Sequence, residues 1–136
     1  MSHPRRIERE AVYPHSPERV WRALVDPAEL AAWLMPNDFA AEVGKEFSLE
    51  TNDDAIGTIQ CEVLELDEPK LLRCRWSAAF GDTEVTFELF PEGDGTRLRV
   101  VHDGFTEPVR PKWVGFDDGW TQKLEQDLPR VLGSVN

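Results

Sequence analysis

The sequence predicts an α+β domain in which a curved antiparallel β-sheet of about six strands wraps around a long C-terminal α-helix. Two patterns predict this fold. From Phe39 to Asp103 hydrophobic residues alternate with polar ones, which is typical of strands with one covered face. After residue 110 the hydrophobic residues instead recur every three or four positions, which is typical of an amphipathic helix. With 136 residues the chain has the size of a single domain, 1–136, built around one core.

An opening strand and two short helices precede the alternating region. Residues 7–13 are rich in β-branched and charged side chains, which favours a strand, and Pro14 ends it because proline cannot donate to a ladder. Ser16 and Asp26 are each followed by a proline, and a capping residue before proline marks the start of a helix. We therefore expect two helices within about twenty residues of the first strand.

Turn signals divide the alternating region into strands that follow one another as an antiparallel meander. On the opposite, charged face, Glu84 and Glu88 lie on a strand between two strands that carry arginines, so we expect ion pairs across strands. The hydrophobic positions share one face, and they are Phe47, Leu49, Ile59, Cys61, Val63, Leu72, Cys74, Trp76, Val85, Phe87, Leu89, Leu98 and Val100, with His102 continuing the series.

The last segment, roughly residues 110–135, is the expected cover of that apolar face. Pro129 interrupts it, and a proline inside a helix removes one backbone hydrogen bond and crowds the carbonyl four residues earlier, here that of Glu125. We therefore expect a kink or an early end near Pro129. The apolar stripe of this segment consists of Trp113, Phe116, Trp120, Leu124, Leu128, Val131 and Val135.

Composition narrows the classes of partner. The net charge of −11 argues against binding to nucleic acid or to an anionic membrane, because phosphate-rich surfaces are bound by clustered lysine and arginine. No apolar run approaches the roughly 20 residues needed to span a bilayer, and the first residues lack the hydrophobic stretch of a signal peptide. A cytoplasmic protein with no nucleic-acid and no membrane partner is expected.

Several segments carry a family resemblance, and they follow one another in the same order as the family's elements. They read PHSPERVWRAL at 14–24, PAELAAW at 27–33, EVLELDEP at 62–69, GTRL at 95–98 with HDGF at 102–105, and GW at 119–120. In these segments and in its order of elements the chain resembles the START-like or SRPBCC superfamily, whose fold is the helix-grip or Bet v-like fold. Within it, the chain is similar to the activator of heat-shock protein 90 ATPase homologue-like branch. The resemblance implies a function in the space between sheet and helix, or a chaperone as partner.

The candidate ligand-binding residues are the aromatic and neighbouring side chains that converge on that space. Aromatic walls with few polar groups are typical of small-molecule pockets, and they are equally typical of a core. His102 is the polar member, able to hydrogen-bond a ligand or transfer a proton, or else satisfied by backbone or by the turn that follows it. The candidates are Trp33, Cys74, Trp76, Phe87, Val100, His102, Trp113, Phe116 and Trp120.

No motif in the sequence predicts a metal or cofactor. Cys61 and Cys74 match no metal-ligand spacing, and a hairpin centred on residues 68–69 makes them diagonal neighbours, which disfavours a disulfide. The acidic clusters lack the order of oxygen ligands that a calcium loop requires, and no glycine-rich phosphate loop occurs. We therefore expect no cofactor and no catalytic metal.

Three functions remain open. The first is binding of a small apolar or aromatic ligand between sheet and helix, with His102 orienting one polar group. The second is a protein-interaction module for a chaperone or other partner. The third is a cofactor-free enzyme of the cyclase, dehydratase or hydrolase kind, which needs a second polar group beside His102, with Cys61, Cys74, Thr51 and Thr58 as the candidates.

Overall fold

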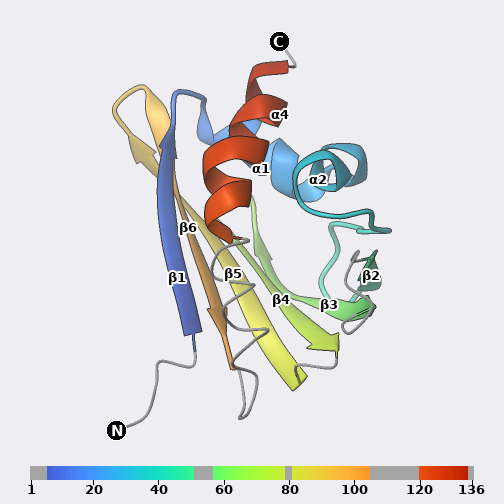
Figure 1. Ribbon diagram of the computed structural model, residues 1–136. Coiled ribbons are helices and arrows are strands. Elements are labelled where there is room, and N and C mark those ends of the chain that lie inside the picture. Colours follow the sequence, from blue (N-terminus) through green and yellow to red (C-terminus); the bar gives the residue numbers. More distant parts are fainter. Residues whose placement is uncertain (1–5, 51–56, 79–80, 105–119, 135–136) are drawn as a thin grey trace, which may run out of the picture.

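One antiparallel sheet forms the frame of the molecule (Figure 1). The computed structural model describes residues 6–50, 57–78, 81–104 and 120–134. Within them the sheet has six strands in the order β1-β6-β5-β4-β3-β2, which confirms the predicted strand number. The strands are β1 (Arg6–Tyr13), β2 (Glu46–Glu50), β3 (Thr58–Asp67), β4 (Leu71–Ala78), β5 (Gly81–Glu92) and β6 (Gly95–Asp103).

The strands from β2 to β6 form the predicted meander, and the first strand joins it at the far edge. There β1 pairs with β6, the last strand, so that Ile7 lies opposite His102 and Tyr13 lies opposite Thr96. On its other side β6 pairs with β5, which places Val85 opposite His102. The end of β6 therefore lies between the first strand, β1, and β5, the strand that precedes it in sequence.

Two short helices, α1 (Pro17–Val25) and α2 (Pro27–Trp33), follow β1 as predicted. The Ser16 hydroxyl accepts a hydrogen bond from the Arg19 N–H, and the Asp26 carboxylate accepts one from the Ala28 N–H. Both caps satisfy backbone donors that the first turn of a helix leaves without partners. The Arg19 guanidinium then contacts the Glu29 carboxylate at 2.7 Å, which ties α1 to α2.

Of the two expectations for Pro129, a kink or an early end, the early end is wrong, because the C-terminal helix continues through this residue. Residues 120–122 are α-helical, η1 (Lys123–Asp127) is a π-helical turn, and α4 (Leu128–Ser134) is α-helical again. The wide π turn lies just before Pro129, where the proline removes one backbone N–H from the hydrogen-bond pattern of the helix. Residues 110–119 of the predicted helix lie outside the described part of the chain.

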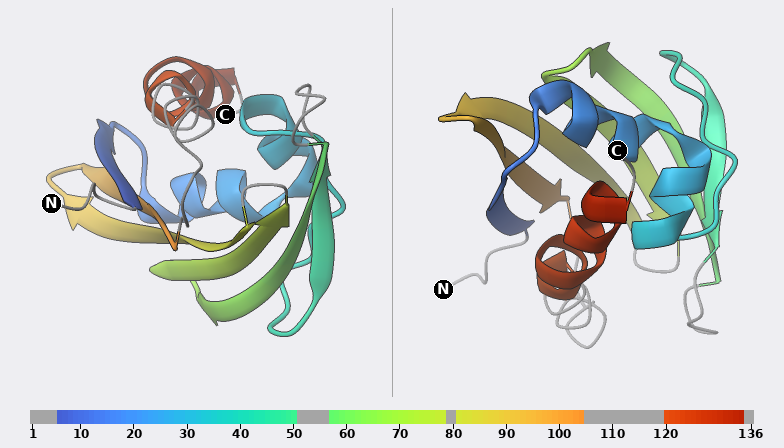
Figure 2. Two further views of the ribbon diagram at one scale, coloured as in Figure 1. Left: turned by 60° about the horizontal axis from the view of Figure 1, so that its bottom comes forward. Right: turned by 90° about the horizontal axis from the view of Figure 1, so that it is seen from above.

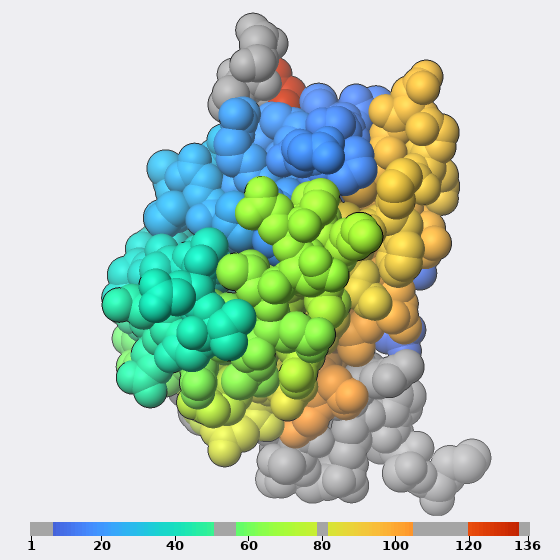
Figure 3. All heavy atoms as spheres, turned by 180° about the vertical axis from the view of Figure 1, so that it is seen from behind, coloured from blue at the N-terminus to red at the C-terminus, as the bar shows by residue number. Residues whose placement is uncertain are grey.

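All helices of the described residues lie on the same, concave face of the sheet, and the sheet curves around them (Figure 2). The face that alternation predicted to be covered is buried, and its side chains form one core with those of the helices. Viewed from behind, the other face presents the side chains of β3 to β6 at the surface (Figure 3). No helix in the described part of the chain is long and apolar enough to cross a membrane.

Ion pairs connect neighbouring strands on the outer face. The Arg73 guanidinium contacts the Glu84 carboxylate at 2.9 Å, and that of Arg99 contacts the Glu88 carboxylate at 2.8 Å, as the alternation predicted. Both arginines also contact a second glutamate, Glu65 and Glu8 respectively. Such exposed pairs each contribute at most about 1 kcal/mol, so the apolar face carries more of the stability.

Gly95 permits a close approach between the start of β6 and the end of β1. A Cβ atom at this position would collide with the backbone carbonyl oxygen of Tyr13 and lie 3.1 Å from its carbonyl carbon. Only glycine avoids this contact with backbone, which cannot rotate away as a side chain can. The glycine therefore allows the Tyr13 backbone to lie close to the start of β6.

We predict that Gly95→Ala lowers the free energy of unfolding by about 1–3 kcal/mol, because β1 and β6 must separate to admit the methyl group. Urea denaturation measures the change. Gly133→Ala is the matched control, since a Cβ there meets nothing within 4 Å and alanine favours the helix, so stability should stay equal or rise. Equal effects of the two substitutions would contradict the steric explanation.

Candidate functional site

Three aromatic side chains from three elements form what we call the aromatic wall: Trp76 of β4, Phe87 of β5 and Trp120 of the C-terminal helix. The rings of Trp76 and Trp120 stack with centroids 5.8 Å apart and planes inclined by 29°. The ring of Phe87 packs edge-on against that of Trp120, with a centroid distance of 5.9 Å. All three are buried, so the sheet and the helix meet here through aromatic surface.

The remaining predicted site residues surround this wall where the structure describes them. Trp33, at the end of α2, packs edge-on against Phe87, and its indole N–H donates to the Ala23 carbonyl at 2.8 Å. Val100 lies opposite Phe87 on β6, and Cys74 lies opposite Val85. Trp113 and Phe116 lie outside the described residues.

His102 is the polar centre beside the wall, and its side chain is fully buried. The indole N–H of Trp120 donates to His102 Nδ1 at 3.2 Å, so this nitrogen carries no proton. Nε2 then holds the proton and donates to the Thr83 hydroxyl oxygen at 2.8 Å. The Thr83 hydroxyl in turn donates to the Trp76 carbonyl at 2.9 Å. One continuous chain of hydrogen bonds thus links the C-terminal helix to three strands.

The environment keeps His102 uncharged. Burial lowers the pKa of His102 from its ordinary value of 6.5 to about 3, because a charged imidazole loses its hydration there. Protonation of Nδ1 would also break the hydrogen bond from Trp120, since a protonated nitrogen cannot accept one. At neutral pH the ring therefore acts as a fixed donor and acceptor rather than as a cation.

The two cysteines are diagonal neighbours, as predicted. Cys61 lies opposite Trp76, whereas Cys74 lies opposite Val63, and both thiols are free and buried. Burial raises the pKa of the Cys74 thiol to about 12 and raises that of Cys61 still further. Both therefore stay protonated at neutral pH, which makes them poor nucleophiles.

Sequence reasoning missed Thr83, the partner of His102. Thr58, which was among the expected partners, instead donates its hydroxyl to the Glu50 carboxylate on an exposed part of the sheet, and Thr51 lies outside the described residues. Thr83 shares the parity of Val85 and Phe87, but it directly follows the turn signal of residues 81–82 and was not among the positions expected on the buried face. The parity was the available signal, because β5 begins earlier than the turn residues suggest.

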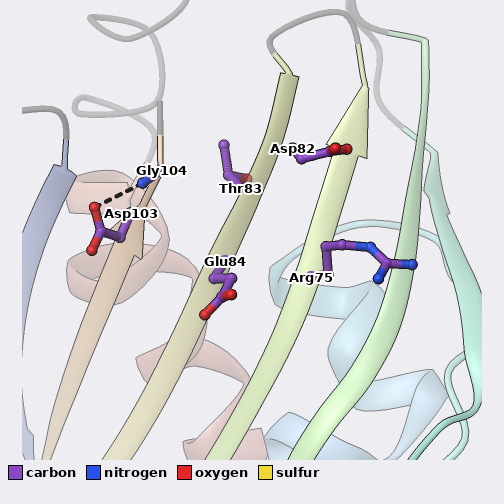
Figure 4. Close-up of a pocket in the computed structure, with 6 residues that line it drawn as sticks. All are labelled: Arg75, Asp82, Thr83, Glu84, Asp103 and Gly104. Carbon is purple, nitrogen blue, oxygen red and sulfur yellow. Dashed lines mark hydrogen bonds between the residues drawn. The ribbon is translucent and has the colours of Figure 1, made fainter. Parts of the chain in front are cut away.

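A polar pocket opens on the outer face, at the end of the sheet where His102 lies (Figure 4). Its volume is about 280 Å³. Thr83 belongs to both sites, since it lines this pocket and also receives the His102 hydrogen bond. The pocket is lined by Arg75, Asp82, Thr83, Glu84, Asp103 and Gly104. Among the residues that the structure describes, no group of three or more acidic, histidine or cysteine side chains is arranged to hold a metal.

A six-stranded antiparallel sheet whose concave face holds two short helices and a C-terminal helix defines the helix-grip, START-like class of proteins. Comparison with protein families identifies the branch. The profile of the family described as "Activator of Hsp90 ATPase homolog 1-like protein" matches residues 14–133, so the chain belongs to this family. None of the curated proteins matches the chain.

Solved structures agree with this assignment. Protein MLL2253 from Mesorhizobium loti is 36% identical over 97% of this chain and 99% of its own, with a TM-score of 0.89. BH1534 from Bacillus halodurans is 27% identical over 97% of this chain and 99% of its own, with a TM-score of 0.83. DynU16, from the dynemicin biosynthetic locus, is 20% identical over 97% of this chain and 48% of its own, with a TM-score of 0.82, which shows the shared fold alone.

We predict that His102 makes the protein less stable as the pH falls from 6.5 towards 3. The unfolded chain binds a proton at its ordinary pKa of 6.5 and the folded chain only near 3, so protons favour the unfolded state between these values. The slope from this residue approaches about 1.4 kcal/mol per pH unit.

The measurement compares the wild type with His102→Gln in urea denaturation at pH 7, 5.5 and 4. Glutamine retains a donor and an acceptor but does not titrate, and all other groups cancel in the difference between the two proteins. We expect the stability advantage of the wild type to shrink as the pH falls. A difference that stays constant over this range would show that His102 is protonated equally in both states.

Proposed function

We propose that the chain binds a small apolar or aromatic molecule between the sheet and the C-terminal helix. The observation that supports this most is the aromatic wall, where nearly parallel tryptophan rings from the sheet and the helix meet beside an uncharged histidine. A flat apolar molecule gains affinity in such surroundings, because each Å² of its own apolar surface that leaves water contributes about 25 cal/mol.

In this mechanism the aromatic wall provides the apolar contacts with the ligand, and His102 positions the indole of Trp120. The ligand packs against Trp76, Phe87 and Trp120, and the edge-on and stacked rings give it surfaces in two orientations. His102 holds the indole of Trp120 through Nδ1 and is itself held by Thr83. The role of His102 is then to orient the indole of Trp120. A ligand oxygen could replace Nδ1 as the acceptor of the indole N–H, and the indole would then orient the ligand.

The family description suggests a second candidate, a module that binds a chaperone. Among the described residues the large hydrophobic side chains that are exposed are Val12 and Val43, at 56% and 58%. A protein partner of this part of the chain would therefore meet mainly charged side chains, and its binding would weaken as salt increases. A pulldown at low and high salt distinguishes this function from ligand binding.

We predict that the uncharged fluorescent probe N-phenylnaphthylamine binds in a saturable manner, and that Trp76→Leu and Trp120→Leu each weaken its affinity by about tenfold, or roughly 1.4 kcal/mol. Each substitution removes aromatic surface from the wall but keeps an apolar side chain in the core. A fluorescence titration measures the dissociation constants.

Phe90→Leu is the matched control. Phe90 is an aromatic residue of the same strand as Phe87, but it lies on the outer face, where the Arg97 guanidinium sits 4.5 Å from its ring centroid. This variant should bind the probe like the wild type. Circular dichroism confirms that each variant is folded, and equal affinities in all four proteins would reject the aromatic wall as the binding site.

A further inference from the structure

The Leu124 carbonyl of the C-terminal helix is satisfied by neither kind of helical hydrogen bond. In an α-helix the Leu124 carbonyl would accept from the Leu128 N–H, but that N–H donates to the Lys123 carbonyl, five residues earlier. In a π register the Leu124 carbonyl would accept from residue 129. Residue 129 is proline, which has no N–H to donate.

Tyr13 supplies the missing donor from the other end of the sequence. Its hydroxyl donates to the Leu124 carbonyl at 2.7 Å, and both groups are buried. β1 lies beside the π turn, which brings the end of the first strand to the helix (Figure 1). Burial and the nearby Glu125 carboxylate raise the pKa of Tyr13, so the hydroxyl keeps its proton and remains a donor.

The two sides of the π turn are held by different parts of the molecule. Beyond the turn, Leu128 and Leu132 are fully buried and the Arg19 guanidinium donates to the Val131 carbonyl at 3.0 Å. Before the turn, the Trp120 indole donates to His102. If this segment returned to α-helical hydrogen bonding with all its residues kept, residues 120–122 would rotate by about 100° relative to α4. The π turn holds one residue more than an α turn, and each residue of an α-helix turns the chain by that angle.

That rotation would take Trp120 out of its contacts with Trp76 and Phe87. Two residues oppose it. In the α register the Leu128 N–H would also donate to the Leu124 carbonyl, so the Tyr13 hydroxyl would have to share an acceptor that it does not share with a helical N–H in the π register. In the same register the ring of Pro129 would crowd the Glu125 carbonyl, which lies four residues earlier.

We propose that Tyr13 and Pro129 together hold the C-terminal helix in the π register that places Trp120 in the aromatic wall. Tyr13 stabilises this register through its hydrogen bond, and Pro129 destabilises the alternative through its ring. Both are positioning residues for the site, and their effect on ligand affinity rests on the function proposed above.

The test reads the register directly through NMR couplings across hydrogen bonds, which identify the carbonyl that accepts the Leu128 N–H. In the wild type we expect a coupling to the Lys123 carbonyl. In the double variant Tyr13→Phe/Pro129→Ala we expect it at the Leu124 carbonyl, since both constraints are gone and the core keeps its aromatic ring. A coupling to Lys123 in the double variant, or to Leu124 in the wild type, would overturn the proposal.

Thr96→Val is the matched control for the loss of a buried hydroxyl. Thr96 lies opposite Tyr13, and its hydroxyl donates at 2.7 Å to the His15 carbonyl rather than to a carbonyl of the C-terminal helix. This variant should keep the coupling to Lys123, although it loses one hydrogen bond. A register change in Thr96→Val would overturn the specific role of Tyr13. Should the double variant not fold, Tyr13→Phe and Pro129→Ala are read singly, and a change in neither would overturn the proposal.

Probe affinity forms the second arm of the experiment. With the helix in the α register, N-phenylnaphthylamine should bind about tenfold more weakly, as in Trp120→Leu. A register change with unchanged probe affinity would support the role of Tyr13 and Pro129 and would instead reject Trp120 as part of the ligand site. The two proposals therefore fail in distinguishable ways.

Discussion

The hydrogen bond between the Trp120 indole and His102 joins the helix to the sheet at a point where water is excluded. A buried polar group without a partner costs about 1–3 kcal/mol, so each member of this chain has to be satisfied by the next. His102 accepts from the helix and donates to Thr83, which donates to the backbone of β4. One uncharged imidazole therefore connects the helix to three strands that their backbone ladders already hold together.

Much of the fold could be predicted from the sequence because its signals are local. A capping residue before proline marks each short helix, and the period-two pattern assigns the buried face, including His102, from neighbouring residues alone. The same pattern placed Cys61 and Cys74 as diagonal neighbours once the hairpin was located. Each of these features depends on a few adjacent residues and therefore needs no knowledge of contacts between distant parts of the chain.

The remaining features depend on contacts between distant residues. Pro129 correctly predicted a distortion of the helix, but the form of the distortion depends on Tyr13, which donates to the Leu124 carbonyl across 111 residues of sequence. Thr83 lies beside a turn signal, so its hydrogen bond with the imidazole becomes evident only when β5 and β6 are paired. The aromatic wall likewise depends on whether the helix has an α or a π turn before α4. Hydrophobic residues that recur every three or four positions do not distinguish these two registers.

The pairing of β1 with β6 has a consequence for how the chain folds. The meander from β2 to β6 forms between neighbours in sequence, whereas β1 must wait for a partner almost ninety residues later and Tyr13 for an acceptor later still. Contacts between distant parts of a chain form slowly, because a long loop must close first. During synthesis the first strand thus leaves the ribosome well before anything it binds, and the last helix completes β1 and the site in a single late step.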